Sequence, residues 1–189
     1  VIYKILGTSV HQQKTTPIYS YPHLSTNLFE NDLIRSEANI TDFDFFHIEE
    51  SLNKITIRPG NWKITKDVII PEGYTVYAGE GVKITLSNHS SILSYSPIYF
   101  EGTEENPVLV SSDKTGEGLF VVGAQKRSIL RYVIFENMSS PINGNWSLTG
   151  SVTFYESPVS LSFTRFEKNR SEDALNIIRS EFIIENSEF

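Results

Sequence analysis

The amino-acid sequence predicts an all-β fold, a right-handed parallel β-helix with about 23 residues per coil over residues 54–189. Short β-branched and aromatic runs alternate with turn residues from Lys54 onward. No apolar stripe with the helical period of about 3.6 residues is long enough to predict a helix. The chain also repeats itself at a nearly fixed interval, as stacked coils do.

Three fifteen-residue segments carry this repeat, and each ends in Phe: residues 121–135, 152–166 and 175–189. The tenth residue of each segment is aliphatic, and the segments start 31 and 23 residues apart. Earlier in the chain, Val76 lies 22 residues before Ile98, which lies 23 residues before Val121. The longer interval contains residues 139–150, which we interpret as a loop inserted into one coil.

The alternation of side chains along each strand predicts which residues face the core. Val152 and Phe154 are expected to be buried, and Thr153 and Tyr155 exposed. The same reasoning buries Val159, Leu161 and Phe163, and assigns Tyr132 to the core position that Phe163 occupies. Equivalent residues of successive coils should form ladders, namely Val121–Val152–Leu175 and Phe135–Phe166–Phe189. A β-sandwich is the alternative fold, but it does not account for a repeated register.

Residues 1–53 lack this period and form a separate segment, either an irregular lead-in that caps the first coil or the tail of a preceding domain. The β-helix then occupies residues 54–189. Because there is no initiator Met and the last residues read as a strand, we expect the chain to be truncated at its C-terminus. We also expect the last coil to associate end to end through its open edge.

Composition narrows the classes of function. The 16 basic and 23 acidic residues give a net charge of −7, which disfavours nucleic acid as a partner. No apolar run reaches the roughly 18 residues needed for membrane insertion. There is no Cys, and the four His residues are scattered without ligand spacing. We therefore expect no metal, no thiol nucleophile and no cofactor.

One polar cluster is the first candidate site. It contains two carboxylates, two guanidinium groups and two amides, on Asn169, Arg170, Glu172, Asp173, Asn176 and Arg179. Acid–base chemistry on a sugar needs paired carboxylates, so this region suits a polysaccharide-active enzyme. The competing interpretation is a charged corner whose side chains satisfy one another. Trp146 and Tyr155 are added as exposed rings on which a sugar could stack.

Four short stretches also carry a family resemblance: residues 71–74 (PEGY), 92–97 (ILSYSP), 150–157 (GSVTFYES) and 169–177 (NRSEDALNI). They resemble bacterial proteins with pectin-lyase-like right-handed parallel β-helix repeats, which are sometimes found with CotH-type spore-coat or envelope domains. The resemblance implies a bacterial, extracellular or cell-envelope location and further coils beyond residue 189. No kinase motif of a CotH-type domain is present, so it implies no kinase activity here.

Together these observations predict a non-enzymatic surface module that binds a polysaccharide or a protein partner along its flank. The alternative is a polysaccharide lyase, epimerase or hydrolase, with its site in residues 169–179 or in coils further downstream.

Overall fold

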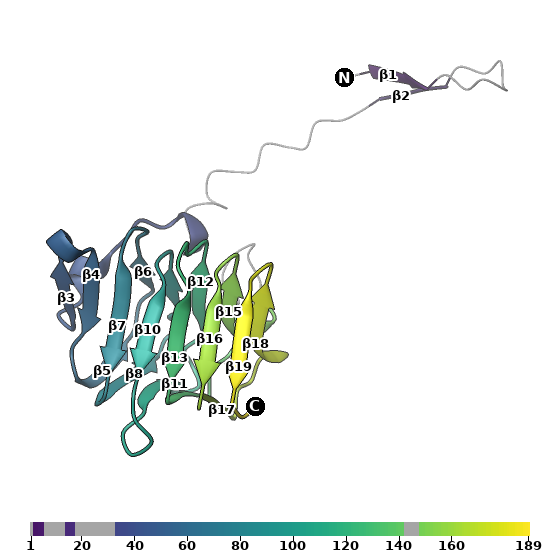
Figure 1. Cartoon of the computed structure of the whole chain (residues 1–189). Coiled ribbons are helices and arrows are strands. Elements are labelled where there is room, and N and C mark those ends of the chain that lie inside the picture. The colour runs from purple at the N-terminus through teal and green to yellow at the C-terminus, as the bar shows by residue number, and fades with distance from the viewer. Residues whose placement is uncertain (1, 6–13, 18–32, 142–147) are drawn as a thin grey trace.

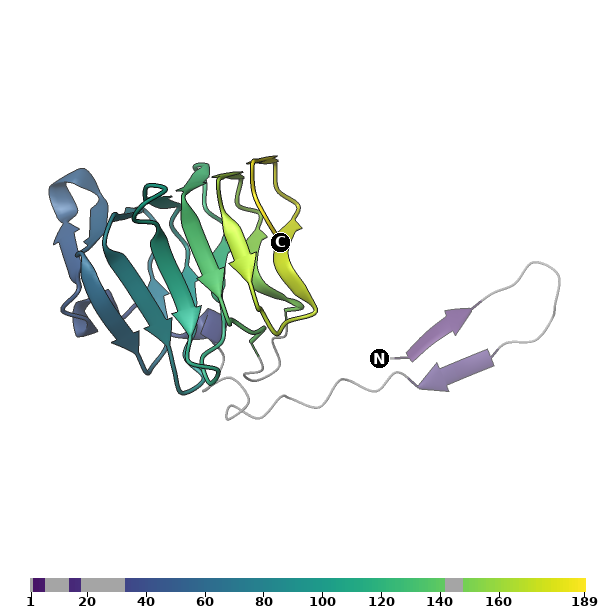
Figure 2. The ribbon, with the colours of Figure 1, turned by 90° about the horizontal axis from the view of Figure 1, so that it is seen from below.

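The computed structural model describes residues 2–5, 14–17, 33–141 and 148–189. Residues 54–189 form a right-handed parallel β-solenoid of about five turns (Figure 1). Each turn passes through a first, a second and a third sheet in that order, and successive turns stack along one axis (Figures 1 and 2). The predicted all-β fold and parallel β-helix are therefore confirmed.

Every strand of the three stacked sheets except β3 is parallel to its neighbours. The first sheet contains β3 (Phe46–Glu49), β4 (Lys54–Ile57), β7 (Thr75–Gly79), β10 (Ile98–Glu101), β13 (Ser128–Arg131), β16 (Val159–Ser162) and β19 (Phe182–Glu185). The second sheet contains β5 (Gly60–Ile64), β8 (Val82–Leu86), β11 (Val108–Ser112), β14 (Val133–Glu136) and β17 (Arg165–Glu167). The third sheet contains β6 (Val68–Ile70), β9 (Ile92–Ser94), β12 (Leu119–Val122), β15 (Gly150–Tyr155) and β18 (Asp173–Ile178).

The remaining elements precede the first coil. Strands β1 (Ile2–Ile5) and β2 (Lys14–Pro17) pair antiparallel with each other. Among the described residues, three single-turn 3₁₀ helices follow, η2 (Leu33–Arg35), η3 (Ile40–Asp42) and η4 (Glu50–Leu52). Strand β3 pairs antiparallel with β4, and Phe45 and Phe46 are buried in the main core. Residues 40–49 thus cover the first coil, while most of residues 1–32 lie outside the described part of the chain.

Buried ladders run the length of the stack. Val152 and Phe154 are fully buried, as predicted. The rings of Phe135 and Phe166 lie 5.1 Å apart, and those of Phe166 and Phe189 lie 5.0 Å apart, so the predicted phenylalanine ladder is confirmed. Such ladders stabilise the stack because each coil buries the apolar side chains of its neighbours.

The register departs from the predicted 23-residue interval. Positions paired along the first sheet are 21, 22, 30, 31 and 23 residues apart, an average of about 25. One longer step contains residues 102–107, an insertion that the sequence analysis missed. The other contains the predicted insertion, because residues 137–149 connect β14 to β15. Residues 142–147 of that connection, including Trp146, lie outside the described residues.

The predicted ladder Val121–Val152–Leu175 is confirmed for Val152 and Leu175 but is wrong by two residues for Val121. Val121 pairs with Phe154, and Val152 pairs with Leu119 and Leu175. The cause is a longer corner, since five residues separate β12 from β13 whereas three separate β15 from β16. A corner of variable length changes the offset without disturbing the stack.

The predicted side-chain orientations of Phe163, Tyr132 and Thr153 are also wrong. Phe163 is 41% exposed, and Tyr132 is partly exposed, because both residues have a φ of +51° and turn their side chains out at a corner. Thr153 is buried because it pairs with Phe120 on the outer face of the third sheet. A second apolar cluster covers that face, made of Leu33, Ile69, Leu93 and Phe120.

The last coil leaves large apolar side chains exposed: Phe182 by 58%, Ile183 by 49% and Phe189 by 66%. Unpaired strand edges with apolar side chains pair readily with another chain. We therefore expect the 189-residue chain to associate through this coil, and the variant Phe182→Lys to weaken that association. Sedimentation velocity across a range of concentrations measures it, and a strictly monomeric chain at every concentration would contradict the prediction.

Candidate functional site

The structure separates the predicted polar cluster into three groups, starting at the corner after β17. The Asn169 side chain accepts a hydrogen bond from the Met138 backbone N–H at 2.9 Å and donates one to the Phe135 carbonyl at 3.3 Å. Arg170 donates to the Asn137 carbonyl at 3.4 Å. These contacts join neighbouring coils, so Asn169 in particular supports the backbone of the stack.

The second group lies at the start of β18. The Asp173 carboxylate accepts a hydrogen bond from the Thr149 hydroxyl at 2.8 Å. The Asn176 amide lies 2.7 Å from the same hydroxyl, and Glu172 is exposed beside them. The partly buried side chains of Asp173 and Asn176 thus both contact Thr149 of the preceding coil.

The third group lies just past the far end of β18, six residues or about 20 Å from Asp173. Arg179 donates to the Tyr155 hydroxyl at 3.2 Å and to the Glu156 carboxylate at 3.3 Å. Its guanidinium group also lies 6.0 Å from the centre of the Tyr155 ring. Arg179 and Tyr155 are therefore brought together, while Asn169 and Arg170 lie elsewhere.

A more continuous surface runs across the first sheet. Tyr77 of β7 and Tyr99 of β10 alternate with buried neighbours and so face outward, and their ring centres are 5.2 Å apart. The Lys54 ammonium lies 5.2 Å from the Tyr77 ring, at a cation–π distance. The first sheet, with β7, β10, β13 and β16 side by side, faces the viewer in Figure 1.

The next two coils continue this surface at the corner between the first and second sheets. The rings of Tyr132 and Phe163 stack at 4.8 Å with an interplanar angle of 10°. Tyr99 pairs with Ile129, so Tyr132 lies three residues, or about 10 Å, further along its strand. We call Tyr77, Tyr99, Tyr132 and Phe163 the aromatic row, because they place one ring on each of four consecutive coils.

A groove of about 440 Å³ opens beside the end of the aromatic row. The stacked rings of Tyr132 and Phe163 line it, together with Pro107 of the inserted loop. Its charged lining residues are Glu104, Arg165 and Glu188. Strand alternation alone does not predict this groove. Its aromatic lining residues lie at corners in the left-handed backbone conformation, where the alternation of the strand no longer sets the direction of the side chain. The repeat of Tyr132 and Phe163 at the same offset was the available signal.

A second groove, of about 450 Å³, lies along the opposite edge of the first sheet. Tyr74, Tyr95, Gln125 and Lys126 line it. The Tyr95 hydroxyl donates to the Ile34 carbonyl at 2.6 Å, which ties part of this edge to the segment before the first coil. The two grooves thus border the same sheet.

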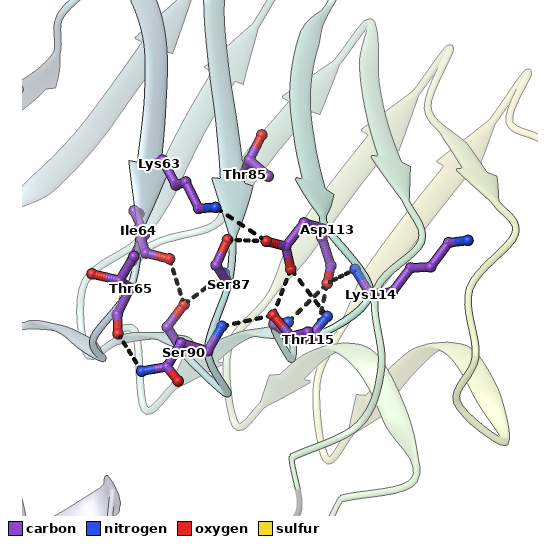
Figure 3. A network of polar contacts seen from close by, with 12 residues as sticks. Lys63, Ile64, Thr65, Thr85, Ser87, Ser90, Asp113, Lys114 and Thr115 are labelled. Atoms are coloured by element: carbon purple, nitrogen blue, oxygen red, sulfur yellow. Dashed lines mark hydrogen bonds and ion pairs between the residues drawn. The ribbon is translucent and has the colours of Figure 1, made fainter.

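A polar network at a corner of the second sheet has a structural role (Figure 3). The Asp113 carboxylate accepts hydrogen bonds from the Ser87 hydroxyl and the Thr115 hydroxyl, both at 2.6 Å. The Lys63 ammonium lies 3.3 Å from it. The hydrogen bonds from Ser87 and Thr115 hold the pKa of Asp113 well below its usual range. The network therefore links three successive coils through one ionised carboxylate.

Asp113 should make the free energy of unfolding depend on pH in the acidic range. Its folded-state pKa is depressed, so its stabilisation is complete above the unfolded-state pKa of about 3.9 and is lost as the pH falls below it. We expect Asp113→Asn to lower the melting temperature at pH 7, and we expect this effect to shrink progressively as the pH falls below about 4. Thermal melts of both proteins across this range measure the difference, with the exposed Asp44→Asn as control. A destabilisation that is constant with pH would contradict the assignment.

Within residues 2–5, 14–17, 33–141 and 148–189, no three His, Asp or Glu side chains lie close enough together to hold a metal ion. The same part of the chain has no helix long and apolar enough to cross a membrane.

Comparison with known proteins finds no matching family, no matching curated protein and no matching solved structure. The fold itself places the chain in the class of parallel β-solenoids.

Proposed function

We propose that this chain is a non-catalytic module that binds a polysaccharide along the flank formed by its first sheet. The aromatic row is the observation that carries the proposal. Aromatic rings offer a sugar a flat apolar contact, and polar edges beside them supply hydrogen bonds. One ring on each of four consecutive coils suits an extended chain of repeating units better than a single small ligand.

The rigidity of the stack supports this function. A flank built from paired strands is already ordered before a ligand arrives, so little conformational entropy is lost on binding. Several weak contacts along one polymer also add through effective concentration. A solenoid can therefore bind a polymer usefully even where each single sugar contact is weak.

The alternative is a polysaccharide lyase, epimerase or hydrolase that uses residues 169–179. Asp173 and Arg179 are its main candidates, but they lie six residues, or about 20 Å, apart along the chain, and each is hydrogen-bonded to other side chains. Incubating the wild type and an Asp173→Ala variant with uronate polymers separates the two proposals. Product formation that is lost in the variant would favour the enzyme.

The binding proposal is tested by titrating the protein with soluble oligosaccharides from bacterial and plant walls. We expect Tyr99→Ala and Phe163→Ala each to weaken binding by about fivefold, because each removes a ring contact of about 1 kcal/mol. The matched control is Tyr155→Ala, a ring outside the aromatic row. If all three variants bind as the wild type does, or if no glycan binds, the proposal fails.

We also propose that the parent protein is a bacterial envelope or extracellular protein related to the pectin-lyase-like repeat proteins that can accompany CotH-type domains. The support is the four resembling stretches together with the parallel solenoid. Protease added to intact cells should cleave this segment. A segment that is cleaved only after lysis would contradict the location.

A further inference from the structure

We infer that the groove beside Phe163 binds an amino-sugar unit with a free, protonated amine. The inference rests on the proposed function, since it assigns the ligand class of the same flank. Its basis is a combination found at this groove: an aromatic stack that ends at Phe163, and two carboxylates without partners.

The charges around the groove do not cancel within the protein. Among the described residues, the carboxylates of Glu104 and Glu188 take part in no hydrogen bond and no ion pair. The one cation that lines the groove is Arg165, and its Nε lies 3.5 Å from Glu167. The two carboxylates and the one guanidinium group that line the groove therefore leave a net negative charge, and Arg165, which pairs in register with Glu188, already has Glu167 as an acidic neighbour.

The exposed end of the aromatic stack adds a second requirement that the ligand must meet. Phe163 is 41% exposed, and Asn186 lines the groove next to it rather than a further aromatic residue. An unstacked part of the ring therefore remains available to the apolar face of a sugar. A ligand that satisfies both features has a pyranose ring and a positive charge, as a de-N-acetylated hexosamine does.

The same charges disfavour uronate polymers. A carboxylate bound in the groove that Glu104 and Glu188 line would meet like charges, and such juxtaposition costs binding energy. The whole chain adds to this effect, because its net charge of −7 attracts polycations and repels polyanions at a distance. A neutral glycan should bind with an affinity between those of the amino-sugar and uronate polymers, because it makes the ring contact but no contact between charges.

The test compares three oligosaccharides of equal length, a glucosamine oligomer, its N-acetylated counterpart and a galacturonate oligomer, at a pH that keeps the amines protonated. Isothermal titration calorimetry on the whole chain should show the highest affinity for the glucosamine oligomer, a lower one for its N-acetylated counterpart and the lowest for the galacturonate oligomer. We expect the amino form to bind about tenfold more tightly than the neutral form at low salt, and this ratio to shrink as salt is added.

The decisive variant is Glu104→Gln with Glu188→Gln, which should bring the amino-to-neutral ratio close to one. Its matched control is Glu72→Gln with Glu80→Gln, which removes the same number of exposed carboxylates outside this groove and should keep the ratio. Melting curves check that all variants are folded.

The outcomes separate the two proposals. If neutral glycans bind through Tyr99 and Phe163 but the groove double variant keeps the amino preference, or if the uronate binds best, the inference is wrong and the proposed function stands. If no oligosaccharide binds, both fail. A lysine-rich peptide that binds more tightly than the amino glycan, and is insensitive to Phe163→Ala, would assign the groove to a basic peptide and would also overturn the inference.

Discussion

Replacing Val152 with Asp is expected to destabilise the protein by about 4 kcal/mol, which is most of the stability of a domain at the lower end of the usual range. Val152 is fully buried and pairs with Leu119 and Leu175 in the neighbouring coils. A carboxylate there would have apolar neighbours above and below. Because the ladder has no partner for it, the aspartate would have to take up a proton or expose itself by opening the stack.

Thermal and urea melts followed by circular dichroism measure this effect. Ser160→Asp is the control, because Ser160 alternates with the buried Val159 and Leu161 and so faces outward on β16. We expect that variant to melt within a few degrees of the wild type. Equal melting temperatures for the wild type and the Val152 variant would show that the inward assignment of this strand is wrong.

Replacing Gly118 with Ala should have a comparably large effect for a different reason. A Cβ at Gly118 would lie 2.2 Å from the backbone carbonyl oxygen of Ser151 in the next coil. Backbone cannot yield as a side chain does, so the two coils would have to separate locally. Overpacking of this kind costs about 1–3 kcal/mol and more where the backbone itself must shift.

Gly79 supplies the matched control for that variant. A Cβ there meets only the Glu101 carbonyl oxygen, at 3.9 Å, which is an ordinary van der Waals distance. Gly79→Ala is therefore expected to leave the melting temperature unchanged or to raise it slightly, since alanine restricts the unfolded chain. Equal destabilisation by the two substitutions would contradict the close approach of the coils at Gly118.

The fold was predictable because the core repeats the same residue types at the same offsets. Phe135, Phe166 and Phe189 occur at equivalent positions, and stacking them requires parallel coils. The offset between coils was less predictable. Corners of different length, such as residues 123–127, change the spacing between strands without any change in the apolar pattern.

The surface was harder to predict than the core. Strand alternation assigned Tyr132 and Phe163 to the interior, but their left-handed backbone conformation turns both rings outward at a corner. Conversely, the polar residues from Asn169 to Arg179 look like a site because they are close in sequence. The structure distributes them along a strand and its two ends, where they contact the preceding coil. Sequence proximity therefore overstated their proximity in space.

The proposed binding function requires a glycan to lie along the aromatic row. Tyrosine ring resonances, recorded by NMR during titration with the glucosamine oligomer, test it most directly. We expect the rings of Tyr77, Tyr99 and Tyr132 to shift together, while those of Tyr95 and Tyr155 stay unchanged. Shifts confined to Tyr155, beside Arg179, would place the ligand at the alternative site and contradict the account.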